Sequence, residues 1–252
     1  MSKNVLIVFL VFFSSDLSAQ MSSQQIKDLV FTAENRLKGK SSIAELKITT
    51  IRPKYSREML IKTWTSGDDY SLMYIKEPAR DRGTSYLKRE KEIWYYIPSI
   101  ERNIKMPPSM MNQSWMGTDL SNDDLVKKTS LANDFDHEFI GEENVNGEDC
   151  YRLKLIPHPE ADIIWGKIEL WIGKSYKNIL RQESFDEDLE LVNTMNAYDI
   201  KSMDGVFVPT RMEFIPADKP EQKTEMQYIT LEFDVAIPPS NFTTQYMTRI
   251  KV

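Results

Sequence analysis

The side chains best suited to bind a metal or transfer a proton lie in one short run, from Asp134 to Glu138. This run contains Asp134, Asp136, His137 and Glu138, and imidazole and carboxylate groups are ordinary zinc ligands. A second histidine at the spacing of a zinc site is missing. An isolated acidic run is more often a solvated end of a strand. We therefore predict no metal and no cofactor here.

The other reactive side chains are equally isolated. His158 lies between two prolines, and Cys150 is the single cysteine, so the chain cannot form an internal disulfide. Cys150 stands in a strand-like run with Tyr151 and Leu153, which predicts a small buried hydrophobic side chain. The sequence contains neither a Gly-x-Ser-x-Gly nucleophile elbow nor a phosphate-binding glycine loop. We predict no catalytic residue and no enzymatic activity.

Soft apolar side chains form the second group with functional potential. Five of them lie in a turn-rich segment with no strand or long helix to bury them: Met106, Met110, Met111, Trp115 and Met116. Such a segment either packs over the protein's own core or covers a cavity that an apolar ligand enters, and spacing alone leaves both open. Methionine suits the second role because its flexible, polarizable side chain adapts to irregular partners.

Aromatic residues of the neighbouring strands are the candidates to line such a cavity. Several strands are apolar on both faces and must be covered twice, as in the run from Tyr70 to Ile75. Each of these side chains taken alone is typical of an ordinary core. Together with the five residues of the turn-rich segment, they predict an apolar binding pocket. The candidate lining residues are Trp64, Tyr70, Met73, Tyr74, Trp94, Tyr96 and Trp171.

Composition and charge narrow the class of protein. The chain of 252 residues carries a formal net charge of -6, which argues against nucleic acid as a partner. Residues 1–19 resemble a cleavable export signal, because Lys3 precedes an apolar run from Val5 to Phe13 and a small residue, Ala19, ends the segment. We expect a periplasmic protein with one domain over residues 20–252, and a monomer.

One long helix and many strands are expected after the signal. Ser22 to Gln25 has the spacing of a capping box, and apolar residues then follow at helical spacing as far as Leu37, before Gly39. Turns are expected at Gly67, Gly147 and Gly205. The expected strands cover residues 43–51, 57–65, 70–76, 86–88, 93–97, 137–141, 149–156, 167–172, 179–185, 191–200, 206–215, 224–235 and 242–249. Periodicity alone allows a strongly curved sheet, a barrel or a sandwich.

The stretch from Gly83 to Asp124 resembles the periplasmic outer-membrane lipoprotein-sorting (LolA-like) family. The similar residues are Gly83 with Tyr86 and Leu87, then Trp94-Tyr95-Tyr96-Ile97-Pro98, then Arg102-x-Ile104, and finally Gly117-Thr118-Asp119-Leu120-Ser121-Asn122-Asp123-Asp124. The resemblance implies a mainly β fold, with a single unclosed antiparallel sheet and a helical lid over its concave face. It also implies a carrier for the acyl chains of a lipid or lipoprotein.

Two functions follow as expectations. The first is a non-enzymatic periplasmic carrier, which takes its cargo from an inner-membrane transporter and delivers it to an outer-membrane acceptor. The second is an envelope sensor or scaffold that uses the same fold to dock a membrane partner. In the second case, the turn from Gly117 to Asp124 is a contact surface instead of a lid hinge.

Overall fold

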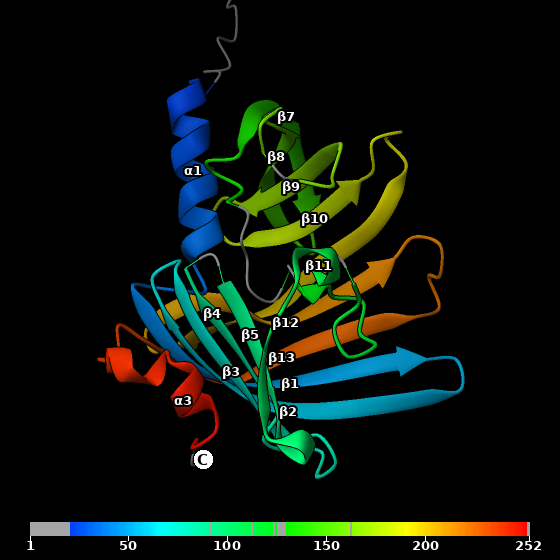
Figure 1. Ribbon diagram of the computed structural model, residues 1–252. Helices are drawn as coiled ribbons and strands as arrows, with labels where there is room; N and C mark the ends of the chain where they lie inside the picture. Colours follow the sequence, from blue (N-terminus) through cyan, green and yellow to red (C-terminus); the bar gives the residue numbers. More distant parts are fainter. Residues whose placement is uncertain are drawn as a thin grey trace, which may run out of the picture.

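The computed structural model describes residues 21–90, 92–111, 113–122, 124, 130–161 and 163–250. The expected export signal and Asp123 lie outside the described residues. The described residues form one antiparallel sheet of 13 strands, in the order β6-β5-β4-β3-β2-β1-β13-β12-β11-β10-β9-β8-β7. Figure 1 shows this sheet strongly curved and not closed into a barrel. The unclosed single sheet predicted from the sequence is therefore confirmed.

The strands follow the predicted ranges closely, with one addition, the short β6. Their bounds are β1 Ser41–Arg52, β2 Tyr55–Ser66, β3 Tyr70–Glu77, β4 Ser85–Arg89, β5 Glu92–Ile97, β6 Arg102–Lys105, β7 Phe135–Val145, β8 Glu148–Pro157, β9 Lys167–Gly173, β10 Ile179–Phe185, β11 Leu191–Met203, β12 Val206–Pro216 and β13 Lys223–Phe233. The predicted turns are also present, because Gly67, Gly147 and Gly205 all have positive φ angles.

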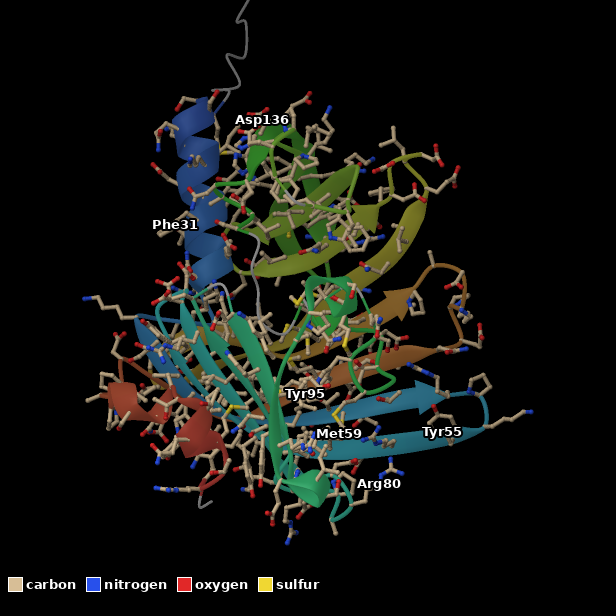
Figure 2. All side chains as sticks on the ribbon, viewed as in Figure 1. Phe31, Tyr55, Met59, Arg80, Tyr95 and Asp136 are labelled. Atoms are coloured by element: carbon tan, nitrogen blue, oxygen red, sulfur yellow. The ribbon has the colours of Figure 1, made fainter. Side chains whose placement is uncertain are left out.

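Helix α1, Ser23–Asn35, begins at the predicted capping box. The backbone N–H of Gln25 donates to the Ser22 hydroxyl, and the Ser22 N–H donates to the Gln25 side chain. The apolar side of the helix buries Ile26, Leu29 and Val30 against strands β8 and β9. Phe31, on the opposite side of α1, is 52% exposed and points away from the sheet (Figure 2). Of the helices in the described residues, none is both long and apolar enough to cross a membrane.

The C-terminal segment differs from the prediction. Residues 242–249 were expected to form a strand, but they follow the 3-10 turn η3 (Pro239–Asn241) and contain the short helix α3 (Thr244–Met247). The Thr243 hydroxyl accepts a hydrogen bond from the Tyr246 N–H and begins this helix. One helical turn lets Phe242 and Met247 reach the same apolar surface of the sheet, which outweighs the β propensity of the segment.

The two faces of the curved sheet are covered by different parts of the chain. We call inner the face on which Leu46, Met73 and Met226 lie, and outer the opposite face. Helix α1 covers the inner face of the β8–β9 region, and residues 106–124 cover the inner face of β1–β5. The segment with α3 packs on the outer face of β2–β5 instead. The expected helical cover over the concave side is therefore supplied by α1, whereas α3 lies on the other side.

Figure 2 shows how one strand serves both a core and an exposed end. Met59 of β2 lies toward the middle of the molecule and is 1% exposed, whereas Tyr55 lies at the far end of the β1–β2 hairpin and is 58% exposed. The strands therefore extend past the core that they build.

Candidate ligand-binding cavity

A cavity of about 550 Å³ lies on the inner face, between the two halves of the sheet. It is bordered by strands β1–β4 and β9–β13, by α1 and by the segment of residues 106–124. This volume falls within the range of sites for drug-sized ligands. Many of the side chains that line it are apolar. They include Leu46, Ile168, Met195, Met212, Phe214 and Met226.

Tyr228 brings a phenol into this apolar wall. It lies on the inner face of β13 between two of the core clusters. Burial raises the pKa of Tyr228 to about 12. The ring therefore stays neutral at physiological pH and adds apolar surface to the cavity.

Glu34 fixes helix α1 beside the cavity. Its carboxylate is 7% exposed and accepts hydrogen bonds from the Ser130 hydroxyl at 3.1 Å, the Leu131 N–H at 3.1 Å and the Ala132 N–H at 3.3 Å. A buried carboxylate needs such donors. These bonds hold the turn before β7 against the helix, so that Leu131 and Phe135 border the cavity.

Residues 106–124, which we call the Met-rich segment, border the cavity on the side of β1–β4. Trp115 is its centre, fully buried against Ile48, Ile61 and Ile75 of the sheet and 5.9 Å from the ring of Tyr86. The backbone closes around it, since the Trp115 N–H donates to the Leu120 carbonyl at 2.7 Å. Trp115 therefore fills the inner face of β1–β4 and narrows the cavity from that side.

Asp119 joins the Met-rich segment to the middle of the sheet. The Arg52 guanidinium donates to both of its carboxylate oxygens, at 2.9 and 3.1 Å. The Thr224 hydroxyl donates to Asp119 at 2.8 Å, and it accepts from the Asp119 N–H at 2.8 Å. Arg52 also donates to the Gly117 carbonyl. The turn from Gly117 to Asp119 is thus an anchor for the segment.

Comparison with known proteins places the chain in a family. A family model described as an uncharacterized protein matches residues 67–249. The chain belongs to this family. None of the curated proteins matches the chain.

Three solved structures share the fold across most of the chain. A DUF1329 family protein from Desulfovibrio piger is 24% identical, with a TM-score of 0.80 over 89% of this chain and 98% of that one. A putative outer membrane lipoprotein-sorting protein domain from Vibrio parahaemolyticus is 20% identical, with a TM-score of 0.76 over 88% and 98%. A LolA superfamily protein from Nitrosomonas europaea is 20% identical, with a TM-score of 0.73 over 90% and 99%. The LolA-like fold is therefore confirmed.

The residues that carry the LolA-like resemblance have structural roles in this fold. Gly83 has a φ of +89°, and a Cβ there would lie 2.9 Å from the ring of Pro98. A side chain at residue 83 would therefore push the end of β5 away. Thr118 is 3% exposed and donates to the Trp115 carbonyl at 2.7 Å. Together with the Asp119 anchor, these contacts give structural roles to Gly83, to Pro98 and to the Gly117-Thr118-Asp119 turn of the pattern.

Only three of the predicted site residues border the cavity. They are Met73 on β3, Met111 of the Met-rich segment, and Tyr70 at the start of β3. Tyr70 also packs on Phe242, with 5.6 Å between the ring centroids. Met106 and Met110 instead pack with Ile93 in a small separate cluster, and Met116 packs with Trp115.

The remaining predicted residues lie on the outer face, and we remove them from the proposed cavity lining. Trp64, Tyr74, Trp94 and Tyr96 pack with the C-terminal segment. Trp171 lies between the guanidinium groups of Arg152 and Arg181, each 4.9 Å from its ring, and its indole N–H donates to Glu143 at 2.9 Å. Alternation could not distinguish the faces, because these strands are apolar on both.

The lining residues that the sequence reasoning missed come mainly from β11 to β13. Met195, Met212 and Met226 alternate there with polar residues of the outer face, such as Asn196 and Glu213. Alternation of this kind marks a strand with one buried face. This alternation could have identified the buried face from the sequence. It does not distinguish a face that borders a cavity from one that packs in a filled core.

The candidate chemistry near His137 does not form a site. Burial lowers the pKa of His137, and its Nε2 lies 2.7 Å from the Leu131 carbonyl. Within the described part of the chain, no three His, Cys, Asp or Glu side chains gather as metal ligands would. Cys150 is fully buried, as predicted, and burial raises its pKa to about 11.

Proposed function

We propose that this protein is a periplasmic carrier that holds the acyl chains of a lipid or lipoprotein for transport toward the outer membrane. The observation that carries the proposal is the cavity of about 550 Å³ between two otherwise well-packed halves of the sheet. Solid packing is the rule in protein interiors. A space of this size with many apolar side chains around it suits a hydrocarbon ligand.

Burial alone supplies the affinity that a carrier needs. Each buried methylene contributes about 0.8 kcal/mol, so about ten methylenes contribute about 8 kcal/mol before the cost of ordering the chain. A longer chain, with about 15 methylenes, contributes about 12 kcal/mol by the same rule, and an ordering cost of about 4 kcal/mol then leaves a dissociation constant in the micromolar range. Binding of this strength retains the ligand in water and still allows release to an acceptor.

No catalytic group is required for this function. Holding and releasing a lipid changes no covalent bond. The residues around the cavity then only contact the lipid and do not react with it. The partners of such a carrier are an inner-membrane transporter as donor and an outer-membrane acceptor. The name of the Vibrio neighbour, a putative outer membrane lipoprotein-sorting protein domain, supports this direction of transport.

A lipid-binding measurement tests the proposal. Native mass spectrometry of protein purified from cells is expected to show bound lipid, and delipidated protein is expected to take up the fluorescent fatty acid cis-parinaric acid. Met195→Asp places a carboxylate on the cavity wall and is expected to weaken uptake at least about 10-fold, because the charge must be desolvated when the tail enters.

A neighbouring residue on the same strand provides the matched control. Asn196 lies on the outer face of β11, opposite Arg181, so Asn196→Asp adds the same charge outside the cavity and is expected to leave uptake unchanged. Absence of lipid from the purified protein, together with no uptake by the delipidated protein, would refute the carrier. It would favour the alternative of an envelope sensor or scaffold.

A further inference from the structure

A row of polar side chains crosses one end of the inner face. Ser42 of β1 pairs in register with Thr65 of β2, Thr65 pairs with Ser71 of β3, and Ser71 pairs with Lys88 of β4. Residues in register on neighbouring strands point to the same face, and all four border the cavity. With strands about 4.8 Å apart, the row is about 14 Å long. We call it the polar row.

The next rows along the same strands are mostly apolar. Ala44 pairs with Thr63, which pairs with Met73, and the row beyond it contains Leu46 and Ile61. The opposite wall of the cavity, on β11 to β13, contributes Met195, Phe214 and Met226. The cavity is therefore polar at one end and apolar along its remaining length.

The polar row combines hydrogen-bond donors with a buried cation. Lys88 is 8% exposed and already makes an interaction within the protein, and its ammonium carries three N–H donors, so it can serve a ligand as well. In the described part of the chain, the hydroxyls of Ser42, Thr65 and Ser71 make no hydrogen bond, so they are available to a ligand. Three hydroxyls and one ammonium suit an acceptor-rich, negatively charged group.

Arg36, the C-cap residue of α1, also borders the cavity and adds a second cation. Two residues further on, Lys38 pairs with Asp68 of the turn that joins β2 and β3, next to Thr65 and Ser71. The Nε of Arg36 is buried and has no acceptor among the described residues. A buried donor without an acceptor costs free energy that a bound acceptor would recover.

The carboxylates that border the cavity are engaged in the fold. Glu34 accepts hydrogen bonds from residues 130–132, Asp119 pairs with Arg52, and Asp68 pairs with Lys38 at 2.9 Å. Asp124 accepts from the Ser121 N–H and hydroxyl at 2.7 Å. These pairings partly compensate the negative charges, so the polar row remains a favourable place for an anion.

We infer that the ligand is an amphiphile with one anionic headgroup, a carboxylate or a phosphate, which binds at the polar row while its acyl chain lies along the apolar wall of β11 to β13. This inference rests on the proposed carrier function and specifies its substrate class. Charge-assisted hydrogen bonds fix the head, and burial of methylenes holds the tail. An uncharged acyl chain of the same length then binds more weakly.

Matched ligand pairs test the inference on delipidated, full-length protein. Palmitic acid is compared with its methyl ester, and a monoacylglycerol phosphate with the corresponding monoacylglycerol, each by displacement of cis-parinaric acid at pH 8. The charged member of at least one pair is expected to bind about 10-fold or more tightly than the neutral member. The pair that shows the preference identifies the head as carboxylate or phosphate.

Two variants locate the preference. Lys88→Met removes the ammonium, and the double variant Thr65→Val with Ser71→Ala removes two hydroxyls at nearly constant size. Each is expected to reduce the preference at least about 3-fold while binding of the neutral ligand stays unchanged. Arg89→Met, which removes an exposed cation from the next position of β4, is the control and is expected to keep the preference. If Lys88→Met does not fold, the hydroxyl variant provides the answer.

The possible outcomes separate the inference from the proposed function. Equal binding of charged and neutral ligands would overturn the headgroup site and leave the carrier intact. Displacement of the probe by inorganic phosphate alone would show a free-anion site and would also overturn the inference. Failure of every acyl ligand to bind would overturn the carrier itself.

Discussion

The ion pair between Arg52 and Asp119 connects a loop to a sheet where water has little access. The two side chains are 11% and 12% exposed, and a charge left without its partner in such a place is costly to desolvate. Asp119 also exchanges two hydrogen bonds with Thr224. One carboxylate therefore holds the Met-rich segment, β1 and β13 together.

Removing this carboxylate is expected to destabilise the protein strongly. Asp119→Ala should lower the free energy of unfolding by about 3–5 kcal/mol, because Arg52 is left buried and unpaired. The exposed pair of Asp218 and Lys219, with side chains 68% and 55% exposed, is the control, and Asp218→Ala should change stability by less than about 1 kcal/mol. Urea unfolding followed by tryptophan fluorescence measures both. Equal effects of the two variants would contradict the anchor.

Tyr228 gives the fold a dependence on alkaline pH. Burial raises its pKa from 10.0 to about 12, so the folded state holds the phenol proton more tightly than the unfolded state does. The resulting stabilisation is fully present below about pH 10 and is lost as the pH rises toward about 12. A shift of about two pKa units corresponds to about 2–3 kcal/mol.

Tyr228→Phe is expected to remove this part of the pH dependence. The difference in unfolding free energy between wild type and variant should stay constant from pH 7 to 9 and should then shift in favour of the variant above pH 10. Urea midpoints at each pH measure that difference. A difference that is flat up to pH 11 would show that the phenol is not desolvated by burial.

The structure brings a predicted site residue to the cavity only where its side chain also lies on the inner face or in the Met-rich segment. Met73 and Met111 border the cavity as expected, whereas Trp64 and Trp94 face the C-terminal segment. All four are large and apolar, and their strands or loops are apolar on several sides. Which face is hollow depends on the curvature of the sheet and on what packs against each side, and neither is encoded within a single strand.

In strand β13, one bulge changes which side chains lie on the inner face. The sequence places Ile229, Leu231 and Phe233 on one face, but Ile229 is 49% exposed. A bulge in the pairing with β1 sets Leu46 opposite Tyr228 and Glu45 opposite Thr230, so that Ile229 is unpaired. One extra residue reverses the facing of the positions before it. Strict alternation therefore identifies the strand but fails at the bulge, where Tyr228 pairs with Leu46 and faces the cavity.

The C-terminal segment covers the outer face of β2–β5. Met247→Ala should cost about 2–5 kcal/mol, because Met247 is 1% exposed among Leu72 and Leu87. Gln245→Ala on the exposed side of α3 should be nearly neutral. The same urea titration gives both values. Because this cluster lies on the face away from the cavity, fatty-acid affinity of folded Met247→Ala should equal that of wild type, and a parallel loss of affinity would contradict the two-face arrangement.

At the scale of the molecule, the resemblance to the LolA-like family settled what periodicity left open. Alternating strands allowed a barrel, a sandwich or an open sheet, and the observed sheet is the open one. Strand order is a matter of long-range pairing, which no local pattern contains. The cavity likewise depends on how the two halves of the sheet assemble, so the part of its wall on β10 to β13 emerged only from the structure.

A bound lipid should stabilise the whole molecule. A ligand at about 100 times its dissociation constant adds about 2.7 kcal/mol to the free energy of unfolding, so cis-parinaric acid is expected to raise the melting temperature of delipidated protein measured by differential scanning calorimetry. Asn196→Asp should respond like wild type, and Met195→Asp should respond less. A melting temperature that falls on addition of the fatty acid would indicate preferential binding to the unfolded chain.

The pairing of β1 with β13 has a consequence for biogenesis. The first and last strands in chain order, β1 and β13, pair at the centre of the sheet. Strands β6 and β7, which follow one another in the chain, lie at its opposite margins. A polypeptide that leaves the ribosome or a membrane pore from its N-terminus cannot close this central seam until residues 223–233 have emerged. The centre of the sheet therefore closes late in synthesis, whereas the hairpins toward both margins can pair earlier.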